Sequence, residues 1–415
     1  MKCKKKNIFL VCYGGGHINI IEPIVDELIK NENYNVKLLA LTTAYIKVKN
    51  KYDKNILKSV SDYLFLFDEK IDTIFQNGLK IFEENYNESI GLSKLEVLSY
   101  LGLSYSESIA KLGEDNAHEE YKKIGRQSFL PINTIKKILD YENIDLLITT
   151  NSPRFEKASL FAAKELNIKS IQIIDLFGDD LMEQNATYTI VMNEMVKNKL
   201  IKKGFEKDSI FALGQPAIEK SIEKVNLIQK DKINIKLSKN KKNLVYFSQV
   251  PANLTDNKNL TSNEMYRDIN DFIFNIFEEL KDSYNILIKA HPSESKEFYE
   301  VYLNKYTYVN FLEGNYDTNS ILSISDIVLT PFSTVALEAI CLNKLVFTFK
   351  PNFCSVYPIK EYKNKPFIYS DSYDELYRNI VDIKFIDSNL NQDNSFLQLN
   401  FKSKFNKLLE NYVFK

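Results

Sequence analysis

Apolar residues near the start of the chain change their spacing within about forty positions. Residues 7–13 form a short apolar run, typical of a strand buried on both faces of a parallel sheet. After a turn at 14–16, apolar side chains recur at helical spacing through 18–29, and 34–41 has the pattern of a second strand. This order of elements predicts a βαβ unit and a parallel sheet.

The same alternation of strands and helices continues along the chain, in two series. Residues 50–130 follow the βαβ unit and precede the rest of the first series. They carry Phe, Tyr and Leu at roughly helical spacing, which predicts a mostly helical stretch. The first series predicts strands at 144–149, 170–176 and 188–191, with helices at 131–141, 153–166 and 194–203, and residues 211–214 lead into the stretch 214–218. The second predicts strands at 244–248, 285–290, 308–311, 327–330 and 345–349, with helices at 261–280, 317–323, 335–342 and 396–412.

Two α/β series of similar size predict two doubly wound, Rossmann-like domains that face a central cleft. We expect the first domain at 1–220, the second at 243–395, and a C-terminal helix at 396–415 that crosses back to the first. Residues 221–242 are rich in Lys, Asn and Ile and have no interleaved aromatic residues. This composition favours a solvated linker over a nucleic-acid-binding patch.

Composition and charge narrow the class of protein. The 415 residues include 54 Lys and Arg against 55 Asp and Glu, a net charge of −1, which argues against a nucleic-acid-coating protein. The apolar stretch behind the basic start is too short for a signal peptide, and charged residues or proline interrupt the longest apolar stretch, so we expect a cytoplasmic location. The four cysteines show no CxxC spacing, and no metal or other cofactor is expected.

A glycine turn after the first strand is the first candidate site. Gly15 and Gly16 would bring the backbone close to a phosphate at a helix N-terminus. His17, one of three histidines in the chain, is placed to act as a general base there. The alternative is a tight turn with an incidental histidine. The turn has neither the GxGxxG spacing of dinucleotide sites nor a P-loop lysine.

Two strand ends in the second series carry the other candidate residues. His291 and Pro292 leave the strand 285–290, and Ser248 ends the strand 244–248. Ser333 and Thr334 open a helix after the strand 327–330, where they either cap the helix or offer hydroxyl groups to a diphosphate. Glu338 lies one helical turn further on the same face, where its carboxylate could accept bonds from a ribose diol.

Together these segments resemble the GT-B superfamily of nucleotide-sugar enzymes. Residues 16–20 (GHINI) are similar to the GHINP segment of UDP-glycosyltransferases, and 333–338 (STVALE) to the SGTxxLE segment of lipid A disaccharide synthase. Residues 291–292 resemble the His-Pro motif of bacterial sialyltransferases and polyol-phosphate transferases, and 214–218 (GQPAI) the GNPxID stretch of UDP-N-acetylglucosamine 2-epimerases.

The resemblance implies a metal-independent glycosyltransferase that uses a nucleotide-sugar donor and a hydroxyl of a bacterial surface glycan or glycolipid. It makes His17 the base, and Ser248, His291, Pro292, Ser333, Thr334 and Glu338 donor-binding residues, with Gly15 and Gly16. In that superfamily an Asp orients the base. Asp179 is our prediction for this role, and Asp175, Asp180, Glu114 and Asp115 are the alternatives.

Several alternatives stay open at this point. Asn151 and Arg154, after the strand 144–149, would bind an anion of donor or acceptor, or Arg154 is an ordinary surface residue. The activity could instead be a CMP- or CDP-donor transfer, a sugar-nucleotide 2-epimerase or hydrolase reaction, or nucleotide binding without catalysis. The aromatic-rich stretch 50–130 either forms a buried core, which the pattern favours, or meets lipid-linked glycan at the inner membrane surface.

Overall fold

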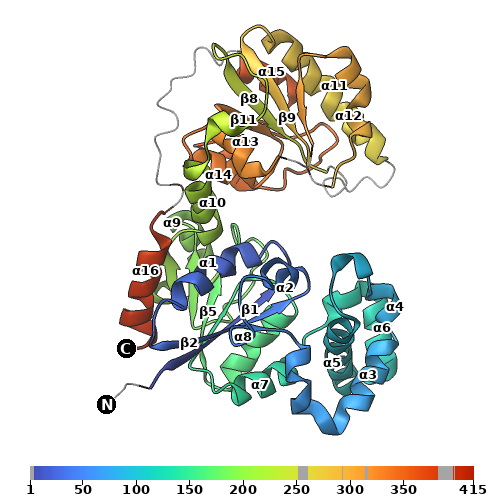
Figure 1. Cartoon of the computed structure of the whole chain (residues 1–415), viewed down its shortest axis with the longest axis vertical. Coiled ribbons are helices and arrows are strands. Elements are labelled where there is room, and N and C mark those ends of the chain that lie inside the picture. The colour runs from blue at the N-terminus through green and yellow to red at the C-terminus, as the bar shows by residue number, and fades with distance from the viewer. Residues whose placement is uncertain (1–3, 251–259, 292, 314–315, 382–395, 397) are drawn as a thin grey trace. The chain divides into compact units, whose positions relative to one another are not determined.

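The computed structural model describes residues 4–250, 260–291, 293–313, 316–381, 396 and 398–415. The chain forms two compact units (Figure 1). Unit 1 comprises Met1–Glu219 together with Gln398–Lys415, and unit 2 comprises Lys220–Leu397. Each unit is an α/β structure built on one parallel sheet, as the alternating pattern predicts.

The sheet of unit 1 has seven parallel strands in the order β3-β2-β1-β4-β5-β6-β7. The strand order reverses between β1 and β4, which are hydrogen-bonded neighbours. Such a reversal is where ligands bind in open parallel sheets, beyond the carboxyl ends of the strands. The strands are β1 (Lys6–Tyr13), β2 (Tyr34–Leu41), β3 (Leu57–Lys58), β4 (Leu146–Thr149), β5 (Lys169–Ile173), β6 (Tyr188–Val191) and β7 (Ile210–Ala212).

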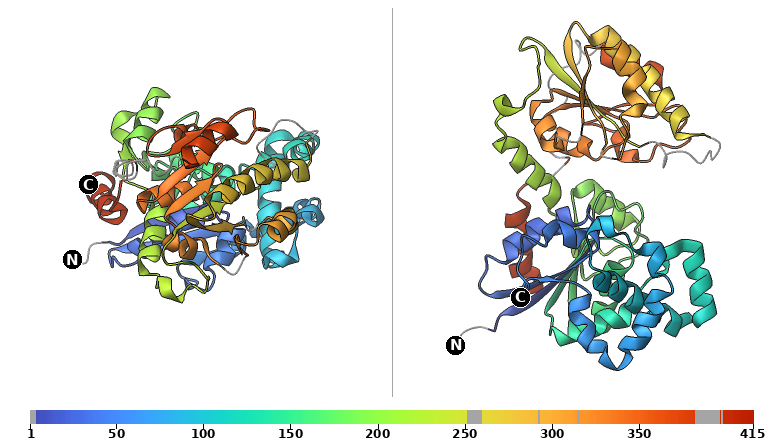
Figure 2. Two further views of the ribbon diagram at one scale, coloured as in Figure 1. Left: turned by 90° about the horizontal axis from the view of Figure 1, so that it is seen from above. Right: turned by 45° about the vertical axis from the view of Figure 1, so that its right-hand side comes forward.

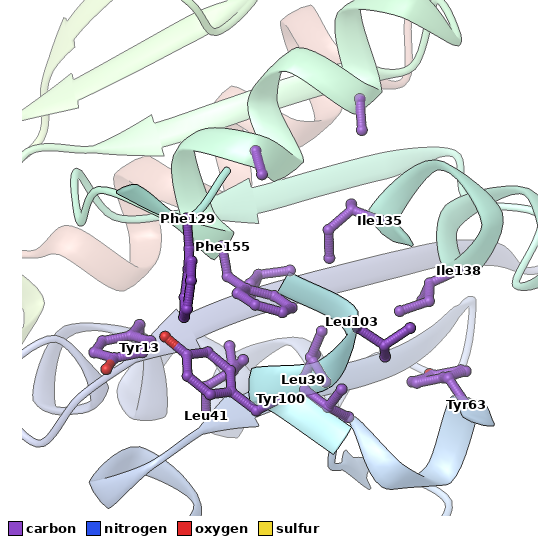
Figure 3. Packing of buried hydrophobic residues seen from close by; sticks show 14 of the residues in the cluster. Tyr13, Leu39, Leu41, Tyr63, Tyr100, Leu103, Phe129, Ile135, Ile138 and Phe155 are labelled. Atoms are coloured by element: carbon purple, nitrogen blue, oxygen red, sulfur yellow. The ribbon is translucent and has the colours of Figure 1, made fainter. Parts of the chain in front are cut away.

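Side chains of β1 alternate between two hydrophobic clusters on the two faces of this sheet. Phe9 and Val11 belong to the cluster that includes residues of α5, α7 and α8, part of which Figure 3 shows. Ile8 and Leu10 belong to the cluster formed with α1 and the C-terminal helix. Both faces of the strand are therefore covered, which explains its uninterrupted apolar sequence. The helices around the sheet are α1 (Ile18–Leu28), α2 (Thr43–Val48), α7 (Ile132–Tyr141), α8 (Phe155–Glu165) and α9 (Glu194–Lys202).

The stretch 50–130 is mostly helical, as its spacing predicts, and lies to one side of the unit 1 sheet (Figure 1 and Figure 2). Helices α3 and α5 approach each other at glycines. A Cβ atom on Gly102 would lie 2.4 Å from the carbonyl oxygen of Ile74, so only glycine fits this crossing. The elements are η1 (Ser61–Lys70), α3 (Ile71–Leu79), α4 (Phe82–Asn85), η2 (Glu88–Ile90), α5 (Lys94–Leu112), α6 (Glu114–Ile124) and η3 (Gly125–Ser128).

Unit 2 contains a six-stranded parallel sheet in the order β10-β9-β8-β11-β12-β13, which reverses between β8 and β11. The strands are β8 (Lys242–Phe247), β9 (Tyr284–Lys289), β10 (Asn310–Leu312), β11 (Ile327–Thr330), β12 (Leu345–Phe349) and β13 (Ile368–Ser370). The helices are α11 (Ser262–Leu280), α12 (Glu297–Lys305), α13 (Thr318–Ile324), α14 (Val335–Cys341) and α15 (Tyr373–Val381). The sequence pattern did not predict α12, β13 or α15.

The segment 221–242, expected to be a solvated linker, is partly structured. Helix α10 (Pro216–Leu227) enters it, and a short 3₁₀ turn, η5 (Lys230–Lys232), follows. The side-chain amide of Asn285 donates to the carbonyl oxygen of Ser238 at 2.9 Å, which ties the segment to β9. These contacts place it in unit 2 rather than between the units.

The C-terminal helix packs on unit 1, as expected of this fold. Helix α16 (Phe401–Leu408) continues into η10 (Leu409–Val413). Phe405 is fully buried in the cluster that includes α1. The Asn406 amide donates to the carboxylate of Glu27 at 2.8 Å. The domain boundary expected at 395 lies outside the described residues. Within the described ranges, no helix is both long and apolar enough to cross a bilayer.

Candidate active site

The turn that leads from β1 to α1 is built around Gly14, which has a φ of +88°. This backbone conformation favours glycine, because a Cβ atom would be strained there. Gly15 and Gly16 do not share this conformation, and a Cβ atom on Gly16 would meet no atom within 4 Å. Of the three glycines expected in the turn, Gly14 is therefore the one that the backbone conformation requires. His17 follows directly, before α1 begins at Ile18.

His17 meets a residue from the neighbouring strand at the point where the strand order reverses. Its Nδ1 lies 2.7 Å from the Oγ1 of Thr150, which follows the end of β4. Thr150 in turn donates its hydroxyl proton to the carboxylate of Glu156 in α8. Thr150 and Glu156 are both fully buried. We call these three side chains the His17 relay.

The relay determines which nitrogen of His17 carries the proton. A threonine hydroxyl has a single proton to donate, and here Glu156 accepts it. The Nδ1 of His17 must then be the donor toward Thr150, because the hydroxyl oxygen can only accept from it. The lone pair of the neutral imidazole is consequently on Nε2. This is the tautomer that a general base needs.

Glu156 accepts hydrogen bonds from backbone groups as well as from Thr150 at its buried position. Its Oε1 accepts the backbone N–H of Tyr13 at 2.8 Å, and its Oε2 accepts the N–H of Ser152 at 3.3 Å. Burial raises the pKa of Glu156, while the charge of protonated His17, the Thr150 hydroxyl and the two backbone bonds lower it. The carboxylate therefore orients His17 and would stabilise the imidazolium that forms on proton transfer.

The prediction that Asp179 orients His17 finds no support in the structure. Asp179 is largely exposed, and its carboxylate lies 2.6 Å from the Nζ of Lys199. Among the aspartates proposed, Asp175 is the one that interacts electrostatically with His17: burial raises its pKa, and the imidazolium charge opposes this. The glutamate of the relay was missed. Glu156 lies in the first turn of α8, where Phe155 and Ala158 are also buried. A carboxylate among apolar residues at the start of a helix is the signal that could have indicated it.

Asn151 and Arg154 lie in the loop after β4, but they differ in what they can bind. Both ends of the Asn151 amide are engaged: Oδ1 accepts the N–H of Asp175 at 2.9 Å, and Nδ2 donates to Asp180 at 3.3 Å. Arg154 has a φ of +75°, and its guanidinium carbon lies 4.0 Å from the centre of the Tyr13 ring. Its Nε is buried without an acceptor in the described part of the chain.

In unit 2, His291 is held at the carboxyl end of β9. Its backbone N–H donates to the Glu294 carboxylate at 2.6 Å and to the Ser248 hydroxyl at 3.2 Å. The Nδ1 of the ring accepts the N–H of Ser293 at 3.2 Å, so the ring proton of neutral His291 is on Nε2. The Nε2 of neutral His291 is therefore a hydrogen-bond donor, whereas the Nε2 of neutral His17 is an acceptor. Ser248 donates its own hydroxyl to Glu294, and Pro292 lies outside the described residues.

After β11, one of the two hydroxyl residues bonds the backbone at the start of the following helix. The Oγ of Ser333 accepts the N–H of Val335 at 3.3 Å, at the start of the seven-residue helix α14. Thr334 makes no side-chain cap. The carboxylate of Glu338, which we expected to face a ribose, instead lies 2.6 Å from the hydroxyl of Ser221 in α10. Burial raises the pKa of Glu338, and the bond from Ser221 lowers it.

The described residues contain no group of three or more His, Cys, Asp or Glu side chains arranged to hold a metal ion. The polar groups gathered at the ends of β1 and β4 are instead a base, a hydroxyl and a buried carboxylate. In chemical terms, this arrangement can remove a proton from a hydroxyl group and stabilise the resulting positive charge.

Comparison with protein families identifies the chain. Residues 162–390, more than half of it, match the model of the family described as CDP-Glycerol:Poly(glycerophosphate) glycerophosphotransferase. The chain belongs to this family. The matched segment includes Glu338 and His291 but not His17. No curated protein sequence matches the chain.

Solved structures with the same fold are nucleotide-sugar enzymes. UDP-GlcNAc 2-epimerase from Methanocaldococcus jannaschii superposes with a TM-score of 0.61 at 14% identity, over 97% of this chain and 99% of that one. The Neisseria meningitidis enzyme bound to UDP-GlcNAc gives 0.62 at 13%, over 98% and 100%. A putative UDP-N-acetylglucosamine 2-epimerase from Listeria monocytogenes gives 0.62 at 12%, over 98% and 96%. The chain therefore has the GT-B fold, as the resemblance implied.

Proposed function

We propose that this protein transfers a polyol phosphate, such as glycerol phosphate, from a cytidine diphosphate donor to a hydroxyl group of an acceptor. The observation that carries the proposal is the His17 relay, a preorganised base at the strand reversal of a chain that belongs to a CDP-glycerol transferase family. Among the possible activities, transfer from a CMP or CDP donor is therefore preferred to transfer of a sugar from a nucleotide-sugar donor.

His17 acts on the acceptor. Its Nε2 takes the proton of the acceptor hydroxyl as the oxygen attacks the phosphorus atom that carries the polyol. A new P–O bond forms, the bond from that phosphorus to the oxygen of CMP breaks, and CMP leaves with the electron pair. The Glu156 carboxylate offsets the positive charge on His17 through Thr150. No step in this scheme calls for a metal ion.

His291 acts on the donor. Because the Nδ1 of His291 accepts the N–H of Ser293, the ring proton is on Nε2. This N–H would donate to an oxygen of the donor diphosphate and stabilise the charge that develops on CMP. Ser248 positions the histidine through its backbone rather than binding the donor directly. Ser333 and Thr334 would line the donor site at the neighbouring strand end, since β8 and β11 are paired. The bond from Ser221 makes Glu338 a structural contact in this scheme.

A comparison of donors tests the proposal. Purified protein is incubated with a glycerol phosphate acceptor and either CDP-glycerol or UDP-GlcNAc, and nucleotide release and product are followed by chromatography and mass spectrometry. We expect CMP and a new phosphodiester from CDP-glycerol, and no product from UDP-GlcNAc. Release of UDP with glycosylated acceptor, or conversion of UDP-GlcNAc to its 2-epimer, would replace the proposed function with glycosyl transfer or epimerisation.

A further inference from the structure

Unit 1 contains a cavity of about 280 Å³ beside the turn that carries His17. Its lining includes Tyr13 at the end of β1 and Gly14 of the turn, together with Arg126 and Arg154. Its size lies at the lower end for small-molecule sites, which are typically ~300–1,000 Å³. It therefore has room for a small chemical unit.

The cavity concentrates a scarce residue type. The chain has only four arginines, and two of them, Arg126 and Arg154, line this one cavity. No carboxylate of the described residues lies within 4.0 Å of either guanidinium. The Nε of Arg154 is buried and has no acceptor in the described part of the chain. Guanidinium groups with free donors are suited to planar, bidentate recognition of phosphate.

A third unpartnered donor lies at the same cavity. Tyr100 of α5 is 4% exposed, and its hydroxyl makes no hydrogen bond of ordinary geometry with any described residue. Its ring packs against Phe155 and Phe129, with ring centres 5.3 and 6.1 Å away, and its hydroxyl points toward Tyr13 (Figure 3). Burial raises the pKa of Tyr100 well above its usual value, so the hydroxyl is a neutral donor. An unsatisfied buried hydroxyl is costly, unless a ligand completes it.

The one carboxylate in the lining does not cancel these donors. Glu96 accepts the backbone N–H groups of Val60 at 3.0 Å and Ser61 at 2.9 Å, one on each oxygen. Burial raises the pKa of Glu96, while these bonds lower it. Each oxygen of Glu96 is engaged by a backbone donor, and neither arginine is paired with this carboxylate.

We propose that this cavity binds a phosphate ester of the acceptor substrate, with Arg126, Arg154 and Tyr100 donating to the phosphate oxygens. The assignment to the acceptor rests on the proposed function, because the cavity adjoins the turn that carries the proposed base. A phosphate fixed here would hold the attached polyol beside His17. The ester could be a terminal phosphate or a phosphodiester within a polymer, since both present the same oxygens.

Direct binding of small probes tests this site. The dissociation constants of sn-glycerol 3-phosphate, inorganic phosphate and glycerol are measured by calorimetry at low ionic strength. The wild-type protein is compared with Arg126→Gln and Tyr100→Phe. Tyr105→Phe is the matched control, because Tyr105 lies on the same helix, outside the cavity lining, with its hydroxyl 3.3 Å from the Nδ1 of His118. CMP is the donor-side probe in every variant.

We expect Arg126→Gln to weaken binding of glycerol 3-phosphate and inorganic phosphate tenfold or more, and Tyr100→Phe to weaken it several-fold. The melting temperature of Tyr100→Phe should stay the same or rise, because an unsatisfied buried hydroxyl is removed. Tyr105→Phe should bind like wild type, glycerol should bind far more weakly than its phosphate, and CMP affinity should not change in any variant.

Two sets of results would overturn the site. In one, wild-type protein binds no glycerol 3-phosphate, or the Arg126 and Tyr100 variants bind it unchanged. In the other, these variants lose affinity for CMP instead, which would make the cavity a donor site. Failure of the proposed function looks different: no CMP would be released from CDP-glycerol, while the Arg126 and Tyr100 variants would still lose affinity for phosphate esters.

Discussion

The His17 relay makes a sharp prediction for Glu156→Gln. If the glutamine oxygen accepts the N–H of Tyr13, the amide NH₂ takes the place of the oxygen that accepts from Thr150 and from the N–H of Ser152; it then donates to the Oγ1 of Thr150, and the bond from Ser152 is lost. The threonine hydroxyl then turns its proton to the Nδ1 of His17, and the proton of the neutral imidazole moves to Nε2. A side chain of the same shape would thus convert the base into a tautomer that cannot accept a proton.

The expected magnitude follows from the lost charge. The two hydrogen bonds of the relay place the carboxylate oxygen of Glu156 about 5 Å or less from the Nδ1 of His17. At that separation and an effective dielectric constant of about 20, one charge stabilises the imidazolium by about 3 kcal/mol. Since each 1.4 kcal/mol is about a factor of ten in rate, this alone lowers kcat about a hundredfold.

The assay is acceptor-dependent release of CMP from CDP-glycerol, supported by nitrogen NMR of the three histidines. Glu156→Gln should lower kcat with little change in the KM for donor, and should move the His17 proton from Nδ1 to Nε2. Glu165→Gln is the control, because this glutamate lies on the same helix but is exposed and paired with Lys136. Wild-type kcat in Glu156→Gln, or an equal loss in Glu165→Gln, would refute the reasoning. Thr150→Val, which interrupts the same relay, serves if Glu156→Gln does not fold.

Four further predictions concern pH and stability. Burial raises the pKa of Glu156 above 4.5, so the wild-type transfer rate should show an additional fall as pH drops through that raised value, which Glu156→Gln lacks. The contribution of Glu156 to the free energy of unfolding is full below about pH 4.5 and is lost as pH rises through its higher folded-state pKa. Urea titrations of wild type and Glu156→Gln across pH would measure this contribution as a difference in the free energy of unfolding. Ser221→Ala leaves the buried carboxylate of Glu338 without its hydroxyl donor and should lower the free energy of unfolding by about 1–3 kcal/mol in urea titration. Phe405→Ala removes a fully buried ring between the C-terminal helix and unit 1 and should cost about 3–5 kcal/mol, measured in the same way.

Much of the fold could be predicted because its signals are local. The strand 34–41 and the strand 327–330 have the bounds that the sequence pattern predicts, since a buried parallel strand is a continuous apolar run. Strand β3 has two residues and β13 has three, too few to show any period, and both were missed. Helix α10 was missed because its lysine-rich sequence has the composition of a linker.

The site could be predicted only in part. His17 was found because a glycine turn after a strand is visible in the sequence. Its partner Thr150 lies 133 positions away, and the contact depends on which strands are neighbours in the sheet. The role of Glu156 depends on the direction of one hydroxyl proton, which no residue pattern encodes. The prediction of Asp179 came from the resemblance, which implies an aspartate but not its place; in the structure the Asp179 carboxylate is paired with Lys199.

The most direct test of the central claim is the rate of CMP release from CDP-glycerol in the presence of acceptor, compared between wild type, His17→Ala and His118→Ala. His118 is exposed on α6 and lies outside the relay, so its variant controls for the loss of an imidazole. We predict that His17→Ala lowers kcat by about 10²–10⁴-fold, the range for loss of a general base, and that His118→Ala keeps the wild-type rate. Wild-type turnover in His17→Ala would contradict the account.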